Sequence, residues 1–184
     1  MYIDPQRYTT RPADDRLPQE FAIYDKLEEL DIPYVRVDHD HADTIEFCQE
    51  VEAVLGGKIC KNLFLCNRQK TKFYLLLMPG DKPFHTKDLS AQIGSARLSF
   101  AGAQEMAQFL DITPGSVSVM GLMNDTDNRV QLLIDRCVAE CPVFACHPCV
   151  NTSSLRMRTQ DMLERFLPAV HHAPIVVDLP DTPV

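Results

Sequence analysis

ICKNLFLCN at residues 59–67 and KFYLLLM at residues 72–78 form the most strand-like part of this sequence. Both segments are rich in apolar and aromatic residues, and the segment between them is short and polar. This pattern predicts two strands joined by a hairpin loop of more than two residues. Pro79 and Gly80 end the second strand, because these residue types are typical of turns.

Helices and strands alternate irregularly before and after this pair. Apolar residues recur at helical spacing over residues 20–30, and Pro33 prevents the helix from continuing. Asp43 or Thr44 can cap a second helix that runs to Leu55, because two glycines follow it. We expect further helices at residues 86–93, 103–110 and 159–166, and further strands at 34–37, 130–138, 143–146, 155–158 and 175–177.

These elements show no fixed-period repeat and no clear domain boundary. A chain of 184 residues is long enough for one domain with a substantial core, whereas two domains would be cramped. We therefore predict one mixed α/β (α+β) domain at residues 19–184, in which helices flank a central mixed β-sheet. Residues 1–18 are expected to form an N-terminal arm.

Charge and composition limit the classes of function. Hydrophobic residues make up 45% and charged residues 24% of the chain, which is ordinary for a globular protein. The net charge of −8 argues against a general nucleic-acid binder, and no DNA partner is expected. Residues 53–80, however, contain no Asp or Glu and five basic residues. This window is typical either of a positive face that docks an RNA end or of a strand edge on which lysines prevent aggregation.

The cellular location is predicted from features that the sequence lacks. Residues 1–17 resemble neither a signal peptide nor a transit peptide. No segment approaches the roughly 18 consecutive apolar residues of a membrane helix. The seven cysteines fit no short secreted disulfide framework, so we expect reduced thiols, a cytoplasmic protein and no membrane partner.

Four segments resemble, in order and spacing, the editing-domain family that is called YbaK-like or prolyl-tRNA synthetase-associated. They extend over residues 20–165 and comprise CKNLFL at 60–65, RLSFA at 97–101, PGSVS at 114–118 with Gly121-Leu122 and Asn124-Asp125, and His147-Pro148 with Asn151-Thr152. The wording KNLFL, RLSFA and PGSVS is most similar to the free-standing members known as ProXp-ala, which hydrolyse Ala-tRNA(Pro).

The resemblance implies the fold of this family and a trans-editing aminoacyl-tRNA deacylase that protects translation fidelity. Its substrate would be mischarged tRNA(Pro), with alanine favoured over cysteine or serine. Its partners would be the acceptor end of that tRNA and prolyl-tRNA synthetase. The resemblance also implies that a terminal ribose hydroxyl and backbone groups assist the attack of water, so that neither a Ser-His-Asp set nor a cofactor is needed. Consistently, the sequence contains no G-x-S-x-G elbow.

Lys61 and His147 are the predicted catalytic residues. The resemblance implies a functional lysine at Lys61, where a compact charge can reach a terminal phosphate or ribose; the alternative is a strand-end lysine in water. Asn62 is a predicted substrate-binding residue, but it faces the opposite side of a regular strand, so one of these two neighbours is expected to be structural. Pro148 favours an extended His147, whose imidazole could bind the substrate, orient water or make a purely structural hydrogen bond.

A glycine-containing loop at residues 114–121 is expected to approach the substrate, although an ordinary connecting turn has the same pattern. It matches the G-x-x-x-P loop of the family but has Val119 in place of proline, which leaves it less preset. Asp125 is also typical of a residue that braces a turn, and Asp135 could face solvent or a pocket. The predicted substrate-binding residues after Asn62 are Gly115, Ser116, Val117, Ser118, Asn124 and Asp125.

The cysteines provide a rival interpretation. Cys146 and Cys149 have the C-x-x-C spacing of redox and metal sites, and zinc bound with His147 is conceivable. Structural thiols are favoured, because Cys137 is expected on an apolar strand and the C-x-x-C does not open a helix after a βαβ unit. A third interpretation is a non-catalytic module of the same fold that binds tRNA or a synthetase.

Overall fold

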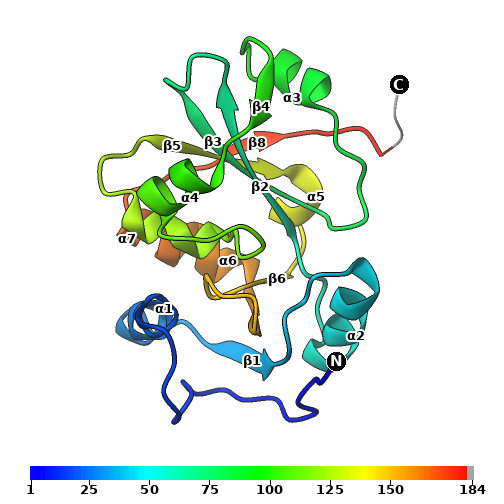
Figure 1. Ribbon diagram of the computed structural model, residues 1–184, viewed down its shortest axis with the longest axis vertical. Coiled ribbons are helices and arrows are strands. Elements are labelled where there is room, and N and C mark those ends of the chain that lie inside the picture. Colours follow the sequence, from blue (N-terminus) through cyan, green and yellow to red (C-terminus); the bar gives the residue numbers. More distant parts are fainter. Residues whose placement is uncertain (182–184) are drawn as a thin grey trace.

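The computed structural model describes residues 1–181 and contains two β-sheets (Figure 1). A five-stranded mixed sheet has the order β4-β2-β3-β5-β8, and a three-stranded antiparallel sheet has the order β1-β7-β6. The predicted mixed α/β domain with a mixed central sheet is therefore confirmed, while the second sheet is a feature that the sequence did not reveal. The strands are β1 (Tyr34–Asp38), β2 (Lys61–Asn67), β3 (Phe73–Met78), β4 (Leu98–Phe100), β5 (Val130–Asp135), β6 (Val143–Cys146), β7 (Ser153–Arg158) and β8 (Ile175–Val177).

The hairpin of β2 and β3 forms as predicted. Lys61 at the start of β2 pairs with Met78 at the end of β3. Asn67 closes the loop, because its Oδ1 accepts hydrogen bonds from the backbone amides of Thr71 (2.9 Å) and Lys72 (3.1 Å). This register directs the turn after Met78 back over the first residues of β2.

The predicted helices are also present. The N-terminus of α2 is capped by Thr44, whose Oγ1 accepts a hydrogen bond from the Phe47 amide, and its C-terminus by Gly56, which has a positive φ of 76°. Figure 1 shows α1 and α2 at opposite ends of β1. The first four helices are α1 (Pro18–Glu29), α2 (Ile45–Leu55), α3 (Thr86–Gln92) and α4 (Ala103–Leu110).

The strand expected at residues 130–138 is wrong in its last three residues. β5 ends at Asp135, and residues 136–139 form the short helix α5 (Arg136–Ala139). The reason is local, because the Asp135 carboxylate accepts a hydrogen bond from the Cys137 amide (2.9 Å) and caps the helix. Cys137 therefore lies exposed on a helix and not on an apolar strand.

Two further segments depart from the prediction. The expected loop at 114–121 passes into the 3-10 helix η1 (Val119–Asn124). The closing helix continues beyond Phe166 into α7, which contains Pro168 at its second residue. This closing helix consists of α6 (Thr159–Asp161), the π-helix η2 (Met162–Phe166) and α7 (Leu167–Ala169).

The N-terminal segment, residues 1–17, lies along the open edge of β1. Tyr8 and Arg36 exchange backbone hydrogen bonds of 2.9 and 2.7 Å, and Ile3 forms an isolated bridge with His39. The segment thus supplies strand-like pairing to an edge that would otherwise be unpaired.

Three hydrophobic clusters form the interior. The largest joins residues of both sheets with α1, α4, η1 and the closing helix, and two smaller clusters lie against α3 and α2. Within residues 1–181, no helix combines the length and the apolar character needed to cross a bilayer.

A buried ion pair joins the turn after β3 to the end of β5. Lys82 Nζ lies 3.0 Å from Asp135 Oδ2, and both side chains are almost completely buried. Burial opposes the charge on Lys82, but the hydrogen bond and the charge of Asp135 outweigh it and raise the pKa of Lys82. Asp135, which the sequence left between solvent and pocket, is thus an interior ion-pair partner.

Lys82→Met should lower the free energy of unfolding by about 3–5 kcal/mol, because it leaves the Asp135 carboxylate buried without its cation. The double variant Lys82→Met/Asp135→Leu should recover most of this loss, apart from about 1 kcal/mol for the helix cap. Urea unfolding of the three proteins measures both effects.

Lys58→Met is the matched control, because its partner Asp81 and Lys58 itself are both exposed. This variant should leave the unfolding free energy nearly unchanged. Equal destabilisation by the two lysine substitutions would contradict the role given to the buried pair.

Candidate functional site

A cavity of about 600 Å³ lies between the start of β2 and helix α2. Five of the nine predicted site residues line it together: Lys61, Asn62, Gly115, Val117 and His147. The structure therefore assembles the centre of the predicted site from three distant parts of the sequence.

The wall formed by α2 and the segment before it was not expected. Asp43, Cys48 and Glu52 line the cavity there, and nothing in the sequence distinguishes them from residues of an ordinary amphipathic helix. Gly80 also lines the cavity. Its position follows from the hairpin, because it comes two residues after Met78, which pairs with the first residue of β2.

Lys61 is held at the edge of the cavity by the turn after β3. Its Nζ donates a hydrogen bond to the Lys82 carbonyl oxygen (3.0 Å). Two other basic residues of the window 53–80 form ion pairs with acidic residues that follow the window: Lys58 with Asp81 and Lys70 with Glu105. The positive face that the window predicts is thus partly neutralised.

Asn62 connects β2 to the loop at residues 114–119. Its Nδ2 donates to the Cys60 carbonyl oxygen (3.0 Å), and its Oδ1 accepts from the Val119 amide (3.1 Å). A proline at position 119 would lack this N–H, whereas Val119 donates it to Asn62. Ser118, directly before it, is extended at φ −148° and ψ 145°, which is the conformation that a following proline favours.

The loop turns at Gly115 and is fastened by Ser118. Gly115 has a φ of +89°, in the region that favours glycine. Ser118 Oγ donates to the His147 carbonyl oxygen (2.6 Å) and accepts from the Met120 amide (3.2 Å). Ser116 and Ser118 are buried and do not line the cavity. The hydrogen bonds of Ser118 support the loop from behind the cavity wall.

Asn124 and Asp125 lie away from the cavity, which corrects the predicted site. The Asn124 amide donates to the Leu110 carbonyl oxygen (2.9 Å). The Asp125 carboxylate accepts from the Arg129 and Val130 amides (3.0 and 2.8 Å) and contacts His172 Nε2 (2.9 Å). Its oxygens are occupied in bracing the turn before β5, so we remove both residues from the candidate site.

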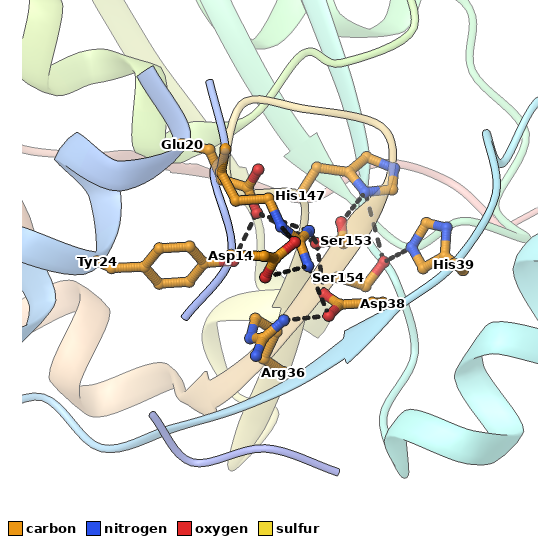
Figure 2. Close-up of polar contacts among 10 residues, drawn as sticks. Asp14, Glu20, Tyr24, Arg36, Asp38, His39, His147, Ser153 and Ser154 are labelled. Atoms are coloured by element: carbon orange, nitrogen blue, oxygen red, sulfur yellow. Dashed lines mark hydrogen bonds and ion pairs between the residues drawn. The ribbon is translucent and has the colours of Figure 1, made fainter. Parts of the chain in front are cut away.

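His147 reaches the cavity as a neutral imidazole. Its Nδ1 donates to the Ser153 carbonyl oxygen (2.9 Å) and lies 3.4 Å from Ser154 Oγ (Figure 2). A carbonyl oxygen only accepts, so the proton belongs on Nδ1 and the lone pair on Nε2. Burial lowers the pKa of His147 to about 4.

The cysteines are not gathered into one cluster with His147. Among residues 1–181, no group of three or more His, Cys, Asp or Glu side chains is arranged to hold a metal ion. Cys146 and Cys149 are buried, and burial raises the pKa of Cys146 to about 12 and also raises that of Cys149. Protonated, buried thiols are poor metal ligands and poor redox groups.

The cavity combines three groups that suit ester hydrolysis. Lys61 supplies a positive charge, and His147 Nε2 can accept a hydrogen bond. Among the described residues, the amides of Gly115 and Val117 have no protein acceptor, and both residues line the cavity. Donors and charge arranged in this way can stabilise a developing oxyanion.

Comparison with known proteins identifies relatives whose names concern the editing of aminoacyl-tRNA. The family model for the aminoacyl-tRNA editing domain matches residues 39–164. The "Prolyl-tRNA editing protein ProX" of Acetoanaerobium sticklandii is 32% identical over 148 residues, which cover 80% of this chain and 90% of that protein. The "Prolyl-tRNA synthetase associated domain-containing protein 1" of Xenopus laevis is 31% identical over 165 residues, covering 88% and 96%.

A solved structure shares the fold. A candidate trans-editing enzyme for prolyl tRNA synthetase superimposes with a TM-score of 0.67 at 15% identity, and the match covers 91% of this chain and 100% of that one. At this identity the likeness concerns the fold alone.

An NMR titration of the histidine side chains should give His147 an apparent pKa about 4, well below the ordinary 6.5. Because the pKa in the folded protein lies below that in the unfolded chain, the unfolded chain takes up the proton first as the pH falls. Stability should therefore decline between about pH 6.5 and pH 4. His147→Gln should remove this part of the decline, and a titration near pH 6.5 would contradict the neutral, buried imidazole.

Asn62→Ala should loosen the loop at residues 114–119 and speed exchange of its amide hydrogens about fivefold, because a hydrogen bond of roughly 1 kcal/mol is lost. Adding Val119→Pro should slow this exchange again, since the ring fixes the backbone without the Asn62 contact. Hydrogen-exchange mass spectrometry measures both steps. Faster exchange in the double variant than in Asn62→Ala would show that proline does not fit this backbone.

Proposed function

The chain belongs to the aminoacyl-tRNA editing domain family, and from this premise we propose that it is a trans-editing deacylase that hydrolyses Ala-tRNA(Pro). The proposal rests chiefly on one observation. Lys61, His147 and the loop around Gly115 come from separate segments and meet at one cavity. The relatives whose names concern prolyl-tRNA editing support tRNA(Pro) as the carrier of the substrate.

In the proposed reaction, water attacks the ester carbonyl that joins the amino acid to the 3′-terminal ribose. The carbon–oxygen bond to the ribose breaks, the amino acid leaves as a carboxylic acid, and the water proton passes to the ribose oxygen. The neighbouring ribose hydroxyl can relay this proton, so no protein nucleophile is required. The step forms no covalent intermediate with the protein.

Each lining residue has a role that fits its geometry. The Lys61 ammonium, fixed on the Lys82 carbonyl, can contact the terminal phosphate or ribose. The Gly115 and Val117 amides can bind the ester carbonyl oxygen as negative charge develops on it. His147 Nε2, with its lone pair, can accept a hydrogen bond from the water or the ribose hydroxyl.

Selection of alanine would depend on the size of the cavity near Val117 and Cys60. An apolar pocket distinguishes ligands that differ by one methylene by only about 1–3 kcal/mol. Proline on its own tRNA must therefore be excluded by steric conflict and not merely bound less well. Since the net charge is −8 and several lysines are paired, we expect brief, salt-sensitive docking of the acceptor end.

The test is hydrolysis of tRNA(Pro) charged with labelled alanine, cysteine, serine or proline at low salt. Ala-tRNA(Pro) should be hydrolysed rapidly while Pro-tRNA(Pro) is spared. Faster loss of the cysteine or serine ester would change the substrate but keep the activity. Loss of none would instead favour a non-catalytic module that binds tRNA or a synthetase.

Lys61→Ala should lower the deacylation rate on the order of 10²-fold, because it removes a charge placed at the reacting group. Lys87→Ala on α3 is the control, since this exposed lysine does not line the cavity. Equal rates for the two variants would remove Lys61 from the site. Circular dichroism and thermal melting check that both variants are folded.

A further inference from the structure

Polar side chains from β1, β7, α1 and the N-terminal segment form a hydrogen-bonded network (Figure 2). At its centre is Ser153, which is fully buried and pairs with Asp38 across the two strands. Its hydroxyl lies 2.8 Å from Asp38 Oδ1 and 3.2 Å from Glu20 Oε1. Two carboxylates therefore converge on one serine in the interior.

Cations compensate this buried negative charge. Arg16 Nη2 lies 2.9 Å from Asp38 Oδ2, and its Nη1 lies 3.3 Å from Ser153 Oγ and 3.6 Å from Glu20 Oε1. Arg36 makes a second contact with Asp38. Burial favours the neutral form of Asp38, but hydrogen bonds from Arg36, Ser153 and Arg16 outweigh it and lower its pKa. Glu20 has Arg16 as its only cationic contact among the described residues.

The same serine holds the imidazole of His147. The Ser153 carbonyl oxygen accepts the hydrogen bond from His147 Nδ1 (2.9 Å), while its hydroxyl belongs to the charged network. Next to it, Ser154 Oγ lies 2.9 Å from His39 Nε2 and 3.4 Å from His147 Nδ1. The position of the His147 ring therefore depends on two successive residues of β7, of which Ser153 is bound by Asp38 and Glu20 and Ser154 by His39.

Arg16 belongs to the N-terminal segment, outside the residues 39–164 that match the family model. The segment is bound to β1 by a backbone hydrogen bond from the Asp4 amide to the Asp38 carbonyl oxygen, and to the residues after β1 by one from the Asp40 amide to the Tyr2 carbonyl oxygen, both of 2.9 Å. The backbone of the N-terminal segment is thus held in place, and its Arg16 guanidinium contacts Asp38 and Ser153.

We propose that Arg16 and Ser153 are positioning residues for His147, so that the N-terminal segment is part of the catalytic apparatus. This inference deepens the proposed function and rests on it. Loss of the guanidinium leaves Glu20 and Asp38 close together with one cation fewer. The Ser153 hydroxyl then loses a partner, and the strand that carries the His147 acceptor is free to shift. Displacement of a reacting group by about 1 Å can cost on the order of 10²-fold in rate.

Arg16→Met and Arg11→Met form a matched pair for the test. Both arginines belong to the N-terminal segment and bind carboxylates, but the Arg11 pair with Asp25 is exposed and remote from Ser153. Arg16→Met should lower kcat for Ala-tRNA(Pro) about tenfold with KM changed less than about twofold, and should shift the imidazole ¹⁵N resonances of His147. Arg11→Met should change neither quantity. Arg16→Lys should restore part of kcat, because lysine returns the positive charge but cannot bind Asp38 and Ser153 at the same time with the planar geometry of a guanidinium.

The outcomes separate this inference from the proposed function. Hydrolysis by Arg16→Met at the wild-type kcat, with unchanged His147 resonances, would overturn the inference even if the melting temperature falls, because the role would then be structural only. If the wild-type protein hydrolyses no ester, the proposed function fails, and the His147 resonances of Arg16→Met and Arg11→Met still decide the positioning role. Should Arg16→Met not fold, Ser153→Ala provides the same readouts, since it removes the hydroxyl and keeps the carbonyl.

Discussion

The antiparallel pairing of β2 with β3 determines where the candidate site lies. Because Lys61 pairs with Met78, the following turn folds back and offers the Lys82 carbonyl oxygen to Lys61 Nζ at 3.0 Å. β3 also pairs with β5, whose last residue Asp135 binds the Lys82 ammonium. A register slip of one residue would turn the Lys61 side chain to the opposite face of the sheet. Backbone pairing at the centre of the sheet therefore places this lysine, and the residues of the cavity wall do not.

The site lies where the two sheets meet, and one loop is tied to both. The Val119 amide is bound by Asn62 of β2, in the larger sheet, while Ser118 Oγ is bound to the His147 carbonyl oxygen after β6, in the smaller sheet. Buried polar groups require partners, and here the partners belong to different sheets. The same hydrogen bonds that satisfy these groups thus fix the distance between the Lys61 and His147 sides of the cavity.

The sequence predicted helices and strands that neighbouring residues determine, and it missed contacts between residues that are far apart in the chain. The helix at 103–110 and the strands at 143–146 and 175–177 have the expected bounds, because apolar spacing and flanking turn residues determine them. The strand expected through residue 138 failed because Asp135 caps a helix within an apolar run, and the apolar Val138 is buried in that helix. Asp125 was predicted both as a turn brace and as a substrate-binding residue, and only the brace is visible in its local sequence, because its partner His172 lies 47 positions later. Likewise, nothing near His39 indicates Ser154, which lies 115 positions away.

Val119 stands where the resemblance implies a proline, and a different contribution to the free energy holds the loop here. A proline at this position would restrict the backbone covalently and act chiefly by reducing the entropy of the unfolded chain. Here Ser118 has the backbone conformation that precedes proline, but a hydrogen bond from the Val119 amide to Asn62 maintains it. Such a bond stabilises only the folded state, by roughly 1 kcal/mol. The shape of the loop therefore depends on Asn62, and this explains why a residue next to Lys61 can line the cavity and be structural at the same time.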